Sequence, residues 1–367
     1  MARATRATLR SVALAVASLL LVAGCGNGDA DDEPAAADDP AEVEEDTDDD
    51  APAEDMGDPV TLNLAHPFPA GHLIQVNVLE PFVDEVAEAT DGTVTIEIHP
   101  AEALSGPGDT YDNTAAGAVD IGWALHGYTP GRFPLTDSVE LPFLFENAEQ
   151  ATNALWDLYD EFPEFQEEYS DVHVLGLWTH DVGNLYIADS AVTEPDLSGL
   201  TLRAPGPIQT NLIEAMGGAG VGLPAPELYD SLERGVIDGL MIADTGVDSF
   251  TLYEVVDHAT VANFYVAGQF LVMNQGAWDS LSDAQQQAID SIAGRDLSLR
   301  AADAYDTAHA NVVQQHDDWG LDVYTVDDLG PWQDAAQNVV DDWIAAREGD
   351  GMPGQEMYDR ILEISGN

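Results

Sequence analysis

Hydrophobic and polar positions along this chain alternate in short stretches, and longer stretches with helical spacing separate them. Residues 60–65 and 93–99 alternate with period two, as half-buried strands do, and residues 79–86 between them carry a helical apolar face. Strands that alternate with helices predict mainly parallel sheets flanked by helices, which is the α/β class. Further strands are expected at 119–124, 172–178, 200–203, 221–223 and 236–243. Residues 184–187 are expected to begin a second domain, and residues 264–274 to return to the first.

The longest periodic segment covers residues 280–318. Ser282 and Gln285 fit a capping box at its start. A continuous helix of about 36 residues would span about 54 Å. The alternative is a pair of ordinary helices broken near Gly294, and the pattern leaves both interpretations open.

Residues 196–244 follow the order strand, helix, strand, helix, strand. Arg203 ends the first of these strands, directly before Gly206 and Pro207 open a helix. Open α/β sheets bind ligands beyond the carboxyl ends of their strands, and a helix N-terminus there favours an anion. The pattern therefore predicts an anion site at Arg203 and Gly206.

Several motifs occur in a specific order. The run L-x-G-L-x-L-R-x-P at 197–205 precedes L-P-x-x-E-L-Y-x-x-L-x-x-G-V-I-D-G at 223–239. This order resembles the solute-binding proteins of tripartite ATP-independent periplasmic (TRAP) transporters, of the DctP type. The resemblance covers roughly residues 60–362, and its further motifs lie at 127–134, 141–145, 270–274 and 278–282.

The resemblance implies a periplasmic-binding-protein-like fold, in which two α/β domains enclose a ligand cleft and a long helix spans both. It implies a protein that captures a small organic acid and delivers it to a TRAP membrane permease, without catalysis or cofactor. The expected parts are a signal peptide (1–25), an acidic tether (26–58), domain I (59–180 plus 268–305), and domain II with C-terminal helices (181–267 plus 306–367).

By the same resemblance, Arg203 forms a bidentate salt bridge with the ligand carboxylate, a task that suits guanidinium geometry. Related sialic acid and dicarboxylate binders usually carry another arginine about twenty residues earlier, but residues 180–185 contain none. The asparagine of their Q-E-N-P motif is replaced by Ile242. These departures favour a monocarboxylate with a less polar body.

Other candidate ligand-binding residues end strands or follow them. Trp123 and Trp178 suit either ligand stacking or the core, and each loop histidine suits either a ligand contact or a structural role. Arg132, in P-G-R-F-P, meets either the ligand or a carboxylate at the domain junction. The complete candidate set is Arg203, Trp123, Trp178, His180, Asn184, Gly206, Ile242, His66 and His126.

The charge balance restricts the partners. The chain has 69 acidic and 10 basic residues, for a net charge of −59, and all of the basic residues are arginines. Such a surface repels nucleic acid and anionic membrane, and is typical of a halophile. At about 1 M salt the Debye length is only about 3 Å, so local contacts rather than steering would decide ligand binding.

The N-terminus reads as an export signal. Arg3, Arg6 and Arg10 precede the apolar run 12–22, and small residues then lead to Cys25, the only cysteine. This resembles a bacterial lipobox, in which Cys25 is lipidated and anchors the protein outside the cytoplasm; the alternative is an ordinary signal peptide. The acidic tether that follows lacks the apolar residues needed for order.

Two other functions are alternatives to transport. The sequence has no HExxH, GxSxG or C-x-x-C motif and no histidine pair at metal-ligand spacing, which argues against an exported hydrolase and against a metal site. A ligand sensor that presents its closed form to a receptor is not separable from a transport protein by sequence.

Overall fold

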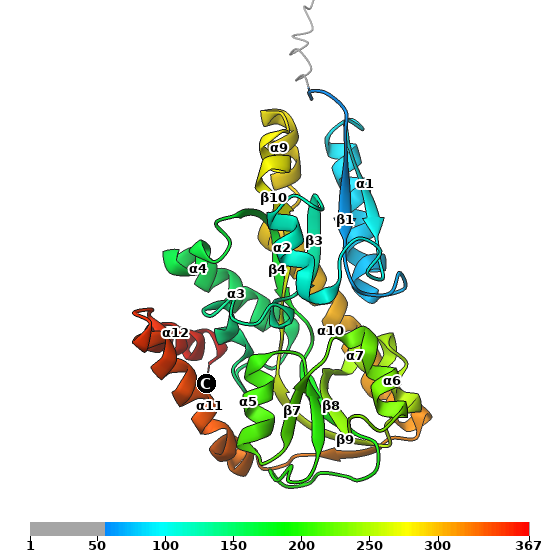
Figure 1. Ribbon diagram of the computed structural model, residues 1–367, viewed down its shortest axis with the longest axis vertical. Helices are drawn as coiled ribbons and strands as arrows, with labels where there is room; N and C mark the ends of the chain where they lie inside the picture. Colours follow the sequence, from blue (N-terminus) through cyan, green and yellow to red (C-terminus); the bar gives the residue numbers. More distant parts are fainter. Residues whose placement is uncertain (1–55, 367) are drawn as a thin grey trace, which may run out of the picture. The chain divides into compact units, whose positions relative to one another are not determined.

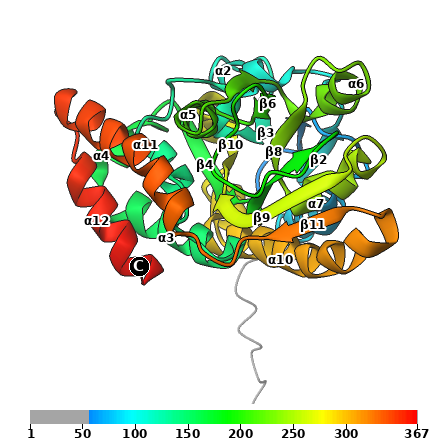
Figure 2. The same ribbon diagram turned by 90° about the horizontal axis from the view of Figure 1, so that it is seen from below.

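Two β-sheets organise residues 56–366, the part of the chain that this computed structural model describes (Figures 1 and 2). The first sheet has the strand order β2-β1-β3-β10-β4. Its strands are Val60–Ala65 (β1), Val94–His99 (β2), Ile121–Leu125 (β3), Val172–Thr179 (β4) and Gly268–Asn274 (β10).

The second sheet has the order β11-β9-β5-β8-β6-β7. Its strands are Gly183–Ile187 (β5), Thr201–Ala204 (β6), Ala219–Gly222 (β7), Gly239–Ala243 (β8), His258–Tyr265 (β9) and Asp322–Thr325 (β11). The central strands β5 and β8 are buried along their whole length, as expected for strands covered on both faces.

Both sheets are mixed, but each has only one strand that runs against the others, so the expectation of mainly parallel sheets is confirmed apart from these two strands. In the first sheet β10 runs antiparallel to both β3 and β4, and in the second β5 runs antiparallel to both β8 and β9. The cause is the path of the chain, which leaves the first sheet after β4 and returns to it through β10. The strands that directly follow the two crossings, β5 and β10, therefore run antiparallel to their neighbours in the sheet that they enter.

Helices cover the sheets, and their apolar faces explain their positions. Helix α1, for example, buries Phe82 and Val86 at helical spacing against the first sheet. The helices are Glu80–Ala89 (α1), Thr110–Ala115 (α2), Ala148–Glu161 (α3), Pro163–Glu167 (α4), Pro207–Ala215 (α5), Leu228–Glu233 (α6), Asp244–Ser249 (α7), Gln275–Asp279 (α8), Asp283–Asp290 (α9), Gly294–Trp319 (α10), Gly330–Gly349 (α11) and Gly354–Ser365 (α12).

The long periodic segment is two helices rather than one. The capping box of Ser282 and Gln285 starts α9, as the sequence predicts. The helix ends at Asp290, and α10 begins at Gly294, whose φ of +71° is incompatible with a continuous helix. Helix α10 is 26 residues long, about 39 Å. It packs against β4 and α3 beside the first sheet and against α7 beside the second, so it still spans both.

The chain crosses between the sheets at the β4–β5 and β9–β10 connections. A backbone hydrogen bond of 3.2 Å from the His180 amide to the Ala267 carbonyl joins the two crossings. One continuous apolar core extends from Val272 in the first sheet to Met241 in the second. The described residues, 56–366, belong to one compact unit, so the expected boundaries of domains I and II remain a prediction.

The signal peptide, Cys25 and most of the tether lie outside the described residues. The tether was expected to reach residue 58, but residues 56–58 are already docked on α9. The Met56 carbonyl accepts from Ser282 Oγ at 3.0 Å, and the Asp58 carbonyl accepts from Gln285 Nε2 at 3.0 Å. Among the described residues, no helix combines the length and apolarity required to cross a bilayer.

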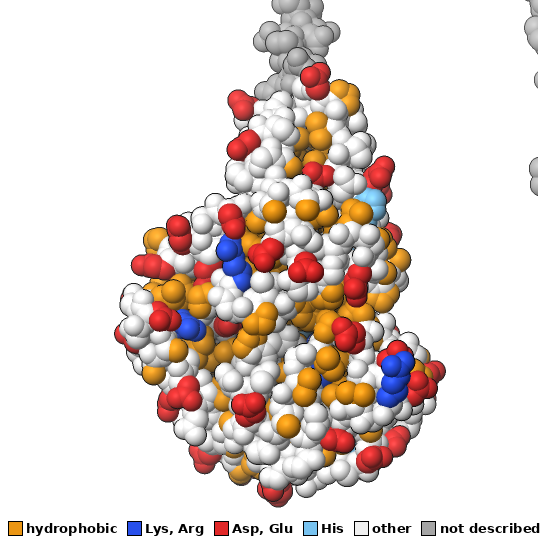
Figure 3. All heavy atoms as spheres, viewed as in Figure 1, with side chains coloured by type: hydrophobic (Ala, Val, Ile, Leu, Met, Phe, Trp, Pro, Cys, Tyr) orange, Lys and Arg blue, Asp and Glu red, His pale blue; other side chains and the backbone are white. Residues whose placement is uncertain are grey.

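Acidic side chains are scattered over the face drawn in Figure 3, and arginines are few. This distribution agrees with the charge balance of the sequence, because dispersed carboxylates remain solvated. An unpaired buried cation is therefore an unusual feature in this molecule.

Candidate functional site

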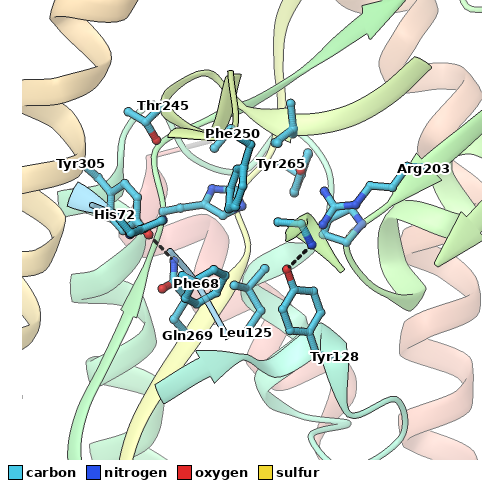
Figure 4. A pocket seen from close by; sticks show the side chains of 16 residues that line it. Phe68, His72, Leu125, Tyr128, Arg203, Thr245, Phe250, Tyr265, Gln269 and Tyr305 are labelled. Atoms are coloured by element: carbon cyan, nitrogen blue, oxygen red, sulfur yellow. Dashed lines mark hydrogen bonds between the residues drawn. The ribbon is translucent and has the colours of Figure 1, made fainter. Parts of the chain in front are cut away.

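A cavity lies between the two sheets, with about 430 Å³ of empty space that includes space open to solvent (Figure 4). The carboxyl ends of β3, β6 and β8 open onto it, which is the position that open α/β sheets use for ligands. Aromatic and aliphatic side chains form most of its wall. The lining residues are Phe68, His72, Leu125, Tyr128, His180, Arg203, Pro205, Ala225, Ile242, Ala243, Thr245, Gly246, Phe250, Tyr265, Gln269 and Tyr305.

Arg203 on β6 is the cation of this cavity, and it is only 2% exposed. Its Nε donates to the Leu223 carbonyl at 2.8 Å, and an Nη donates to the Met241 carbonyl at 2.9 Å. These neutral acceptors hold the guanidinium in a fixed direction without neutralising its charge. The sheet therefore positions a cation at the wall of the cavity.

No carboxylate of residues 56–366 lies within 4.0 Å of the Arg203 guanidinium. Every other arginine in this range has such a partner, at 2.6 to 3.5 Å. The pairs are Arg132–Asp171, Arg234–Asp230, Arg295–Asp157, Arg300–Glu85, Arg347–Asp350 and Arg360–Glu161. Because a buried charge without a counter-ion is costly, an anion beside Arg203 would be favoured.

Two tyrosines add donors beside Arg203. The Tyr128 hydroxyl accepts from the Ala225 amide at 3.0 Å, which leaves its own hydrogen free. The buried Tyr265 hydroxyl has no hydrogen-bond partner among the described residues. Burial raises the pKa of both tyrosines, against the opposing effect of the Arg203 charge, so both hydroxyls remain protonated. This end of the cavity thus combines one cation with two neutral donors.

Two more of the expected residues line the cavity. Ile242 places an apolar side chain where related binders carry an asparagine. The His180 ring donates through Nδ1–H to the Asp181 carbonyl at 2.5 Å, and burial lowers its pKa, so the ring is neutral. Neither residue supplies a second positive charge.

Trp123 and Trp178 lie behind the cavity wall rather than in it. Both are fully buried, and both Nε1 atoms donate to Gln269 Oε1, at 2.9 and 3.2 Å. Gln269 itself lines the cavity. The tryptophans therefore occupy core positions and orient a lining residue.

The remaining candidates have partners within the protein and lie outside the lining. Burial lowers the pKa of His66 to about 4, and its Nε2 lies 3.0 Å from Gln75 Oε1. Burial also lowers the pKa of His126 to about 3, and its Nε2 lies 2.8 Å from the Tyr169 hydroxyl. Asn184 joins β5 to Asp244 and to the β9 backbone. Gly206 borders a neighbouring surface hollow.

Arg132 does not line the cavity. Its Nη lies 2.6 Å from Asp171, and its guanidinium covers the Tyr111 ring at 4.7 Å. This pair lies at a surface hollow that Pro134 and Glu168 also line. The structure thus places Arg132 with a carboxylate on the first-sheet side of the chain.

Sequence reasoning missed most of the aromatic wall. Tyr128 belongs to the motif at residues 127–134, which follows β3, so its position near a strand end was a usable signal. Tyr305 on α10 and Phe250 after α7 reach the cavity through tertiary packing, and nothing in the local pattern marks them.

A buried ionic cluster supports the wall at Thr245. Asp181, in the β4–β5 connection, accepts from both the amide and the hydroxyl of Thr245. His309 on α10 lies 3.3 Å from Asp181 and 3.4 Å from Asp244. Burial, with Asp181 nearby, raises the pKa of Asp244 to about 6, and the hydrogen bond with Asp181 raises the pKa of His309. The cluster ties α10 to the crossing between the sheets.

Solved structures of similar chains bind acids. The chain has a TM-score of 0.80 and 28% identity to a marine metagenome TRAP solute-binding protein specific for aromatic acid ligands, solved with 3-hydroxybenzoate, over 84% of this chain and 99% of that one. It has a TM-score of 0.79 and 26% identity to a TRAP solute-binding protein from Rhodoferax ferrireducens with copurified benzoate, over 84% and 98%. A solute-binding protein of Chromohalobacter salexigens is 26% identical over 72% of this chain and 80% of its own length.

These similarities confirm the expected fold class and the expectation that the protein is not an enzyme, since the similar chains are transport binding proteins. The family model described as bacterial extracellular solute-binding protein, family 7 (DctP) matches residues 64–346, which is most of the chain. The chain therefore belongs to this family, the solute-binding proteins of TRAP transporters.

Proposed function

We propose that this protein captures an aromatic monocarboxylate outside the cytoplasm and delivers it to a TRAP membrane permease. The observation that carries the proposal is Arg203, a buried guanidinium at the cavity wall with no carboxylate partner among residues 56–366. A ligand carboxylate between Arg203, Tyr128 and Tyr265 would supply the missing charge and accept the free donors.

The rest of the cavity favours an aromatic body. Phe68 and Phe250 contribute ring surface, and Leu125 and Ile242 contribute aliphatic surface. Arg203 is the single arginine of the lining, so a second carboxylate would be buried without a cation. The two similar solved proteins hold 3-hydroxybenzoate and benzoate, which are acids of this kind.

Calorimetry with a panel of acids at high salt tests the proposal. We expect benzoate and hydroxybenzoates to bind, and glucuronate and succinate to bind at least about a hundredfold more weakly, because the apolar wall cannot pair their additional polar groups. Tighter binding of the sugar acid or of the dicarboxylate than of every aromatic acid would contradict the proposal.

We further propose that Cys25 carries a lipid that holds the protein at the membrane. Its support is the small-residue leader before a cysteine that occurs once in the chain. Cys25→Ser should release the protein from washed membranes into the soluble extracytoplasmic fraction, as measured by immunoblotting. Retention of the variant at the parental level would contradict the anchor.

A further inference from the structure

We infer that the cavity has a second polar end, at Tyr305 and Thr245, that selects aromatic acids bearing a ring hydroxyl. The inference rests on the proposed function, because it assumes that the ligand carboxylate lies at Arg203. The observations that support it do not involve Arg203. They are the hydrogen bonds of Gln269, Tyr305 and Thr245, and the donor or acceptor capacity that these bonds leave unused.

The first step is the orientation of Gln269. Its Oε1 accepts from Trp123 Nε1 and from Trp178 Nε1. Indole nitrogens can only donate, so these two contacts fix which end of the amide is the oxygen. The amide nitrogen is thereby directed to the Tyr305 hydroxyl, at 2.8 Å, and must donate to it.

The second step is the Tyr305 hydroxyl itself. It accepts from Gln269, and burial raises its pKa, so the oxygen keeps its own hydrogen. That hydrogen has no acceptor among the described residues, and Tyr305 lines the cavity. A buried donor without a partner is costly, so a ligand acceptor at this position would be favoured over an apolar group.

Thr245 has the complementary capacity. Its hydroxyl donates to Asp181, so its hydrogen is already in use while the oxygen can still accept. Tyr305 can therefore donate to a ligand hydroxyl, and Thr245 can accept from one. A phenolic hydroxyl both donates and accepts, whereas a carboxylate or a halogen cannot donate.

The two polar ends face different parts of one ligand. Figure 4 shows Arg203 and Tyr128 on one side of the cavity and Tyr305 and Thr245 on the other. The side chains of Phe68 and Phe250 lie between these groups in the same view. An aromatic ring between the phenylalanines would thus point its carboxylate to Arg203 and a ring substituent to Tyr305.

The test compares benzoate, 3-hydroxybenzoate and 4-hydroxybenzoate with the matching 3- and 4-chlorobenzoates, which have similar size but no donor. Calorimetry on the parent protein should show that at least one hydroxybenzoate binds about tenfold more tightly than its chloro analogue and than benzoate. The ring position, 3 or 4, at which a hydroxyl increases the affinity identifies where the ligand hydroxyl lies in the cavity. If neither hydroxybenzoate exceeds its chloro analogue by more than twofold, the inference is wrong.

Two variants locate the effect. Tyr305→Phe should reduce the hydroxyl preference to less than about twofold, even if the loss of the Gln269 contact weakens all acids together. Tyr265→Phe is the matched control, because it removes another buried tyrosine hydroxyl at the Arg203 end. It should weaken all acids alike and preserve the preference.

A preference that survives Tyr305→Phe would overturn the inference. Failure of the proposed function is a different outcome, since none of the aromatic acids would then bind the parent protein.

Discussion

Arg203→Ala should weaken benzoate binding by about 30-fold to several thousand-fold in calorimetric Kd. Removing one partner of a desolvated charge pair costs about 2–5 kcal/mol, which corresponds to this range. Arg203→Lys should recover only part of the affinity, because an ammonium group cannot form the planar bidentate contact of a guanidinium. The uncharged analogue benzamide should bind the parent weakly and lose much less affinity on the alanine substitution.

The ligand-free protein should respond to the same substitution in the opposite sense. Arg203 has no carboxylate partner in residues 56–366, so its removal relieves a buried charge rather than breaking an ion pair. We expect the Tm of ligand-free Arg203→Ala to equal or exceed that of the parent in calorimetric scans. Arg203 would then lower the stability of the ligand-free protein while it increases the affinity for the ligand, as functional residues often do.

Arg234→Ala is the matched control for this experiment. Arg234 pairs with Asp230 on the exposed surface of α6, and its side chain is 70% exposed. Its removal should change neither Kd nor Tm appreciably, because exposed ion pairs contribute about 0–1 kcal/mol. Arg203 would prove to support the fold if its alanine variant bound benzoate within threefold of the parent, or if benzoate and benzamide lost affinity equally.

The sequence predicted those features that local pattern determines. Alternation located most of the strands. The strand-to-helix turn after Arg203 indicated that this cation lies near the carboxyl end of its strand. The capping box at Ser282 was found because it depends on two residues three positions apart. Each of these signals is contained within one element or one turn.

The features that were missed depend on contacts between distant residues. Gln269 is oriented by Trp123, 146 positions away, and that contact makes the Tyr305 hydroxyl an acceptor from the amide, which leaves its hydrogen free. The parallel or antiparallel direction of β10 depends on the path of the chain between two sheets. The aromatic identity of Trp123 was visible in the sequence, but its place behind the wall was decided by core packing.

We expect the cavity to open at the surface between the two sheets. Gly127, which follows β3, lies against the Pro205–Gly206 backbone, which follows β6. Tyr128 and the Ala225 amide are hydrogen-bonded across the same junction, and so are Glu140 and Gln209. The chain crosses between the sheets through short connections and α10, so bending there would separate these contacts and admit the ligand.

Gly127→Val should therefore impair binding without unfolding the protein. A Cβ at Gly127 would lie 2.8 Å from the Pro205 carbonyl oxygen and 2.9 Å from Gly206 Cα, and both are backbone atoms that cannot rotate away. The closed form would have to shift, at a cost of about 1–3 kcal/mol, whereas an opened form would accommodate the side chain. We expect benzoate affinity to fall by about ten- to a hundredfold in calorimetry.

Gly222→Val is the control that separates an effect on closure from an effect of added side-chain volume. Gly222 borders the same hollow as Gly206, but a Cβ there meets no atom within 4 Å, so this variant adds equal volume without a clash. Its Kd should match that of the parent. The ligand-free Tm of Gly127→Val should stay close to the parental value, because the clash is relieved when the sheets separate. A Gly127→Val protein that melts well below the parent without ligand, or that binds benzoate as tightly as Gly222→Val, would show that this junction does not open.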